Sequence, residues 1–196
     1  MIRLRPGYPH RSLSPGGGNV GDRVSQIILL CEDDPHAQLV RRYLKKAGLD
    51  TNPPVFIPRN ASREVHGGNV GWVLREFPRE LVACRHRHSV NANTLLIAIV
   101  DADHFTVAQR RAEMVAFAND PVVVLIPRRH VETWIRAVQD LETIDETTDY
   151  KRPEPSRAGI RDAADQIYAW AHGNPLPSFR SVPSLSDSLA EWRKIG

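Results

Sequence analysis

The chain has 196 residues, 41% of them hydrophobic and 25% charged, which is ordinary for a folded domain with a substantial core. No apolar run approaches the roughly 18 residues that span a bilayer, and Cys31 and Cys84 form neither a metal spacing nor a disulfide framework, so we expect a cytoplasmic protein without a membrane partner. The net charge of +3 is modest, but basic clusters such as "RHRH" (85–88) and "RRH" (128–130) favour a polyanionic partner.

The first half of the chain alternates strand and helix signals. Residues 1–24 are rich in Pro, Gly and Ser, which predicts a flexible arm, and "QIILLC" is typical of a strand buried on both faces. Asp34 is expected to cap the next helix, with Pro35 at its first position and Gly48 as its stop. A second strand is predicted in "PVFIP" (54–58), followed by a loop.

The second half continues the alternation. Helical periodicity, broken or kinked near Pro78, marks "NVGWVLREFPRELVACRHRH", and "TLLIAIV" (94–100) is the clearest strand of the chain. The remaining predicted elements are a helix in "TVAQRRAEMVAFAN" (106–119), a strand in "VVVLIP" (122–127), and helices in "HVETWIRAVQDL", "AGIRDAADQIYAWAHG" and "LSDSLAEWRKI".

This order predicts an α/β three-layer sandwich built on a mostly parallel, four-stranded sheet. The chain would divide into a flexible N-terminal arm (1–24), an α/β domain (25–142) and a C-terminal extension (143–196). The extension, a helix and a Pro/Ser-rich tail, would pack on the domain or on a partner.

Acidic residues follow two of the predicted strands: Glu32, Asp33 and Asp34 after the first, and Asp101 and Asp103 after the third. Ligands of open parallel sheets bind at the carboxyl ends of strands, so the two groups would meet if their strands are neighbours. Asp101 and Asp103, two positions apart on an extended chain, point to the same side, and close carboxylates need a counter-charge. Mg²⁺ or Mn²⁺ would supply it.

Such a site would support hydrolysis of a phosphodiester, with Glu32 as a third ligand or as a general base. The simpler alternative is that Asp103 caps the following helix and Asp101 merely ends a strand.

The order of elements resembles the TOPRIM domain of topoisomerases, primases and OLD-type nucleases. In that domain a strand ends in Glu, a helix follows, and a later strand ends in Asp-x-Asp. The matching residues are Glu32, Asp101 and Asp103, and the resemblance covers roughly residues 25–140. The segment "IPRRHVETWI" is also similar to one in small bacterial TOPRIM-like proteins, which would bring Glu132 to the site. One departure is Asp33, where TOPRIM domains usually carry Gly.

The resemblance implies a Mg²⁺-dependent nuclease, active on DNA or RNA, that serves phage or mobile-element defence with an ATPase partner; a homodimer is compatible with it. Basic residues expected to contact phosphates are Arg85, Arg87, Arg128, Arg129 and His130.

Two other functions remain open. The stretch "IILLCEDDPHAQLVRRYLKKAG" also resembles the start of a response-regulator receiver, in which Asp101 would accept phosphate. That match lacks the expected Ser or Thr after "VVVLI" and the later Lys. The other hypothesis is a non-catalytic subunit that binds nucleic acid or a partner protein.

Overall fold

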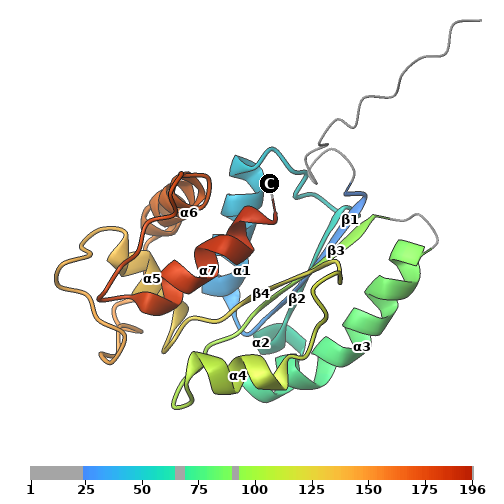
Figure 1. Cartoon of the computed structure of the whole chain (residues 1–196), viewed down its shortest axis with the longest axis horizontal. Coiled ribbons are helices and arrows are strands. Elements are labelled where there is room, and N and C mark those ends of the chain that lie inside the picture. Colours follow the sequence, from blue (N-terminus) through green and yellow to red (C-terminus); the bar gives the residue numbers. More distant parts are fainter. Residues whose placement is uncertain (1–23, 65–68, 90–92, 196) are drawn as a thin grey trace, which may run out of the picture.

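A computed structural model describes residues 24–64, 69–89 and 93–195. The predicted arm therefore lies outside the described residues, apart from Val24. The strands form one parallel sheet in the order β2-β1-β3-β4 (Figure 1). Their bounds are β1 (Gln26–Cys31), β2 (Phe56–Asn60), β3 (Thr94–Ile99) and β4 (Val122–Leu125).

Helices cover both faces of the sheet, so the predicted α/β class with a three-layer arrangement is confirmed. In Figure 1, α1, α5, α6 and α7 lie on one side of the sheet, and α2, α3 and α4 on the other. The helices are α1 (Asp34–Lys46), α2 (Ala61–Glu64), α3 (Val70–Ser89), α4 (Val107–Glu113), α5 (Val131–Ala137), α6 (Arg157–Ala171) and α7 (Pro183–Arg193). No helix among these described segments is long and apolar enough to cross a membrane.

The apolar strands are explained by this double cover. Successive side chains of a strand point to opposite faces, so Ile27 and Leu29 enter the core under α1, whereas Ile28 and Leu30 enter the core under α3. A strand covered on both faces needs apolar residues at every position, which is why β3 is buried throughout.

The C-terminal helices pack on the α/β domain. Trp192 of α7 is fully buried, and its ring centroid lies 4.3 Å from that of Tyr43 in α1. The Tyr43 hydroxyl donates a hydrogen bond of 2.8 Å to the Trp192 carbonyl. Residues beyond 142 thus share one core with the first helix.

Several predicted boundaries were wrong. Asp33, not Asp34, caps α1, because its carboxylate accepts from the backbone N–H of His36. The helix predicted over 106–119 stops at Glu113, since Met114 turns into the core beneath α3 and α4. Strand β2 begins and ends two residues later than predicted.

Helix α3 runs through Pro78 as one element. Pro58 is tolerated in β2 because that strand lies at the edge of the sheet, where one side of its backbone needs no partner strand.

Candidate metal centre

The carboxyl ends of the parallel strands form one rim of the molecule, and most of the predicted site residues lie there. Strands β1 and β3 are direct neighbours, with Cys31 paired to Ile99, so the segments that follow them leave the sheet side by side. The residues of this rim are Glu32, Asp33, Asp101, Asp103, His130 and Glu132.

Asp101 is the centre of the rim. Its backbone N–H donates a hydrogen bond of 2.7 Å to Glu32 Oε1, which ties the ends of β1 and β3 together. Its carboxylate is almost fully buried: Oδ1 lies 3.0 Å from His36 Nε2, and Oδ2 lies 3.6 Å from His130 Nδ1. Burial by itself would raise the pKa of Asp101, but the two histidines lower it below its ordinary value.

His36 was not predicted as a site residue. It lies in the first turn of α1, fully buried, with Nδ1 2.6 Å from Asp33 and Nε2 3.0 Å from Asp101. Burial would lower the pKa of His36, but the two carboxylates raise it well above its ordinary value. The one-turn spacing of Asp33 and His36 was a usable signal, whereas the contact with Asp101 spans 65 positions and had none.

Asp103 sits in a strained loop. Its φ is 53°, in the left-handed region that Asp tolerates better than most side chains. Nη1 of Arg128 holds this loop by donating to the carbonyls of Asp103 (3.0 Å) and Phe105 (2.6 Å). The helix that follows is capped by Thr106, so the proposed capping role of Asp103 is wrong.

His130 completes the rim from the chain that leaves β4. It occupies the position before α5, yet its side chain makes no capping hydrogen bond. Within the described part of the chain, neither ring nitrogen has a hydrogen-bond partner, although the side chain is only 8% exposed. Its Nδ1 faces Asp101 Oδ2 at 3.6 Å and Asp103 Oδ1 at 4.0 Å, too far for hydrogen bonds.

Two groups of side chains at the rim could hold a metal ion, and they share Asp101. In each group, one ligand atom per residue lies within 4.8 Å of the others. The groups are Glu32, His36 and Asp101, and Asp101, Asp103 and His130.

The second group fits a divalent cation better. Both nitrogens of His36 already contact carboxylates, so a cation there would displace existing hydrogen bonds. His130 instead offers an unpartnered, buried nitrogen that faces two carboxyl groups. A cation between them would relieve the carboxylate repulsion and satisfy the ring.

The pKa of Glu32 is raised to about 8 by burial and by the charge of Asp101, whereas the pKa of Asp101 is lowered. At neutral pH the metal-free site therefore keeps a proton on Glu32. A carboxyl group that titrates near neutrality is suited to general acid–base chemistry.

Glu132, predicted as a further acid, lies in the first turn of α5 and is 5% exposed. It belongs to neither candidate group and instead lines a shallow pocket beside the rim, together with Lys151 and Arg152 of the loop between α5 and α6. Burial and the charge of Asp101 raise the pKa of Glu132. Asp33, Asp34 and Glu154 line the same pocket, so Lys151 and Arg152 lie among four acidic side chains, a grouping that the sequence analysis did not predict.

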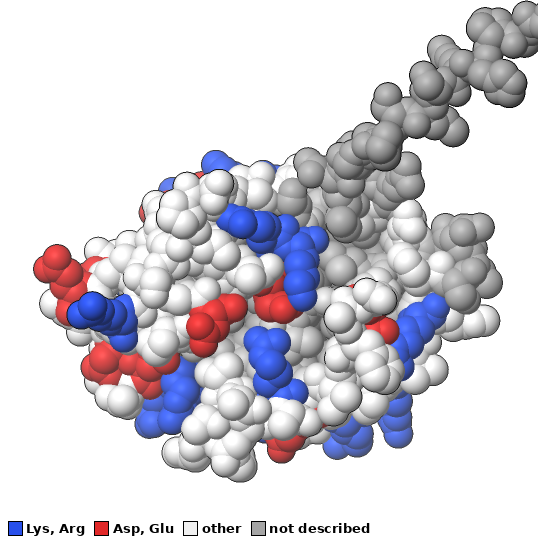
Figure 2. Space-filling view, in the orientation of Figure 1, with Lys and Arg blue, Asp and Glu red and all other residues white. Residues whose placement is uncertain are grey.

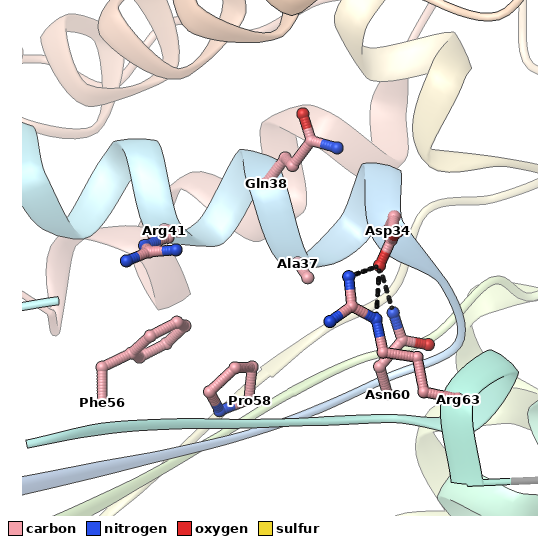
Figure 3. Close-up of a pocket in the computed structure, with 8 residues that line it drawn as sticks. All are labelled: Asp34, Ala37, Gln38, Arg41, Phe56, Pro58, Asn60 and Arg63. Carbon is pink, nitrogen blue, oxygen red and sulfur yellow. Dashed lines mark hydrogen bonds and ion pairs between the residues drawn. The ribbon is translucent and has the colours of Figure 1, made fainter. Parts of the chain in front are cut away.

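Asp34 turns away from the centre. It faces a second pocket, between α1 and the edge strand β2, where its Oδ1 accepts from Asn60 Nδ2 at 2.8 Å and Arg63 Nη2 at 2.8 Å (Figure 3). Arg41 and Phe56 line the far end of this pocket. Asp34 therefore stabilises the junction of α1 with β2 and α2, and it also lines the pocket beside Glu132 at the rim.

The predicted phosphate-binding residues separate into two places. Arg128, Arg129 and His130 follow β4 at the carboxyl rim, whereas Arg85 and Arg87 lie near the end of α3, at the opposite, amino edge of the sheet. Arg85 is held there by two hydrogen bonds to Asp120, of 2.7 and 2.6 Å.

Basic and acidic side chains alternate over the face shown in Figure 2, with no continuous basic surface on that face. At the rim, Lys151 and Arg152 line the pocket beside Glu132.

Comparison of the chain with family models, with curated proteins and with solved structures finds no match in any of the three. The resemblance to TOPRIM domains therefore stays a prediction, as does the receiver-like alternative. For the latter, the Asp101 side chain would have to become accessible, because it is 3% exposed and bonded to His36.

Proposed function

We propose that the chain hydrolyses phosphodiester bonds of nucleic acid with the help of a divalent metal ion, Mg²⁺ or Mn²⁺, held by Asp101, Asp103 and His130. The observation that carries the proposal is the buried His130 ring, which faces two carboxyl groups at the carboxyl ends of the strands and has no hydrogen-bond partner among the described residues. A bound divalent ion would polarise the phosphate and lower the pKa of a coordinated water.

The side chains around the ion would divide the remaining work. Hydrolysis forms a bond between a water oxygen and phosphorus and breaks the bond to one ester oxygen, so one proton leaves the water and one reaches the leaving group. Glu32 is placed for this exchange because its carboxyl group lies beside Asp101, from whose backbone N–H it accepts a hydrogen bond, and burial raises its pKa in the metal-free protein. Its Oε1 is engaged by the Asp101 N–H, so protons would move at Oε2.

Substrate contacts would come from the neighbouring pocket. Lys151 and Arg152 are exposed there beside Glu132, and each could pair with a phosphate oxygen of a nucleic-acid strand. The proposed substrate is therefore DNA or RNA.

The test is cleavage of single- and double-stranded DNA and RNA by the full chain in Mg²⁺ and in Mn²⁺. The variant Asp103→Asn should lose at least about 100-fold in rate, because it removes a charged ligand without emptying the core. The matched control is Asp162→Asn, since Asp162 lies exposed on α6 and pairs only with Arg161 among the described residues.

Cleavage that survives unchanged in Asp103→Asn would overturn the proposal. Phosphate transfer from a small phosphodonor to Asp101, without cleavage of any polymer, would support the receiver-like alternative instead.

A further inference from the structure

We propose that Asp149 positions His130 as a nitrogen ligand, so that the rim selects a first-row transition-metal ion such as Mn²⁺ over Mg²⁺. The inference rests on the proposed function only in placing a divalent ion at the same group of side chains.

The first step concerns the unsatisfied ring. Leaving a buried polar group without a hydrogen-bond partner costs stability, so such groups are rare in folded proteins unless a ligand completes them. His130 has both nitrogens in this state, although α5 begins directly after it and a capping bond would have been available. A ligand at Nδ1 accounts for this orientation.

The second step concerns spacing. Nδ1 of His130 lies 3.6 Å from Asp101 Oδ2 and 4.0 Å from Asp103 Oδ1. Two ligand atoms that sit at right angles around a small divalent ion, each at about 2.1 Å, are about 3 Å apart. A contraction of about 1 Å would therefore bring each of the two carboxylate oxygens to that spacing from Nδ1.

The third step concerns the far side of the ring. Nε2 of His130 lies 3.6 Å from Asp149 Oδ1, on the loop between α5 and α6. Asp149 is held in place because the same oxygen accepts a 2.9 Å hydrogen bond from the Lys151 backbone. Metal-bound histidines usually direct the free N–H to a carboxylate, which keeps the other nitrogen deprotonated and aimed at the metal. Asp149 faces this nitrogen, and an approach of about 0.6 Å would bring it to hydrogen-bond distance.

The donor set then decides the class of ion. Mg²⁺ takes oxygen ligands almost exclusively and is bound weakly by imidazole, whereas first-row transition metals accept nitrogen readily. A site of two carboxylates and one imidazole therefore favours Mn²⁺ or Co²⁺ over Mg²⁺. Mn²⁺ is the most useful probe because it is paramagnetic.

The experiment has two readouts on the full chain. Isothermal titration with Mn²⁺ and Mg²⁺ should show at least about 10-fold tighter binding of Mn²⁺, and electron spin echo modulation of the Mn²⁺ complex should show coupling to an imidazole nitrogen. In His130→Ala the nitrogen coupling should vanish and the Mn²⁺ preference should fall. In Asp149→Asn the coupling should persist while Mn²⁺ binding weakens by about 10-fold.

The matched control is His172→Ala, because His172 is exposed at the end of α6, where it contacts Tyr168. Nitrogen coupling in wild type that disappears only in His130→Ala supports the inference. The spectrum of the wild-type complex alone establishes that a nitrogen is bound, even if a variant fails to fold. Mn²⁺ bound without nitrogen coupling, or no Mn²⁺ binding at millimolar concentration, would overturn it.

The cleavage assay separates the two proposals. If the chain cleaves nucleic acid in Mg²⁺ but its Mn²⁺ complex shows no nitrogen coupling, the phosphodiesterase proposal stands and the role of His130 is wrong. If the Mn²⁺ complex shows nitrogen coupling but no polymer is cleaved, the metal ligand stands and the phosphodiesterase proposal is wrong.

Discussion

The charged side chains at the two edges of the sheet differ in how they are paired. At the amino edge, Arg85 and Asp120 form a paired contact with two hydrogen bonds, and the Arg85 guanidinium also lies 5.1 Å from the Phe117 ring. At the carboxyl rim, Asp101 and Asp103 both face the buried His130, whose nitrogens have no hydrogen-bond partner among the described residues.

The difference separates charges that stabilise the fold from groups arranged for a ligand. A paired charge is compensated by its partner without any bound ligand. Buried groups that lack partners, or that repel one another, cost stability until a ligand compensates them. The comparison therefore predicts that changes at the amino edge affect stability and that changes at the rim affect metal binding and cleavage.

The largest expected effect is on activity at the rim. Replacing both Asp101 and Asp103 by Asn should abolish metal binding and reduce cleavage by at least about 1000-fold, because two charged ligands are lost. Titration calorimetry and a cleavage assay measure this. Circular dichroism checks the fold, since Asp101 also neutralises the buried His36.

The next effect concerns the amino edge. In Asp120→Ala, the free energy of unfolding should fall by about 1–3 kcal/mol, because the Asp120 carboxylate accepts from Arg85 and from the Phe117 N–H at 2.6 Å. Urea unfolding measures the loss, and cleavage should be unchanged. A loss of cleavage in a folded Asp120→Ala protein would break the comparison between the two edges.

The edges should also respond to pH with opposite signs. The pKa of Glu32 is raised to about 8, so between about pH 4.5 and 8 the folded, metal-free protein binds more protons than the unfolded chain, and stability falls as pH rises. Glu32→Gln removes this cost and should stabilise the chelated protein above about pH 5, by up to a few kcal/mol near pH 8. Urea unfolding from pH 4 to 9 in EDTA measures this, with Glu142→Gln as the exposed control.

Asp120 should behave in the reverse way. The hydrogen bonds from Arg85 are the main cause that lowers the pKa of Asp120, so its stabilisation is present above about pH 4, the ordinary carboxyl value, and is lost as pH falls through the lowered value. The stability difference between wild type and Asp120→Ala should therefore shrink in acid. A difference that stays constant down to pH 2 would show that the carboxylate charge contributes nothing.

The smallest effect concerns affinity for nucleic acid. Replacing Lys151 and Arg152 by Ala should weaken binding several-fold and reduce its salt dependence by about two ions, because both side chains line the pocket beside Glu132. Arg87→Ala is the matched test of the amino edge and should leave affinity unchanged. Fluorescence anisotropy across a salt series measures both, and a stronger effect of Arg87→Ala would return the binding surface to the amino edge.

The sequence by itself determined the class of fold and the position of the acids. Apolar runs such as "TLLIAI" are typical of strands buried on both faces, and the helices between them favour parallel connections. Because the carboxyl ends of parallel strands share one edge, Glu32, Asp101 and Asp103 could be assigned to a common rim from their order alone.

Only the tertiary structure decided which side chains complete the rim and which are used elsewhere. His36, His130 and Asp149 come from three segments far apart in the sequence, and no local periodicity encodes their distances to Asp101 or to one another. Arg128 was predicted to bind phosphate, but its guanidinium donates to two backbone carbonyls. Asp34 is acidic like Glu32 and Asp33 beside it, but its carboxylate accepts a hydrogen bond from Arg63. Secondary structure follows from patterns within a few residues, whereas the partners of a polar side chain depend on where the whole chain packs.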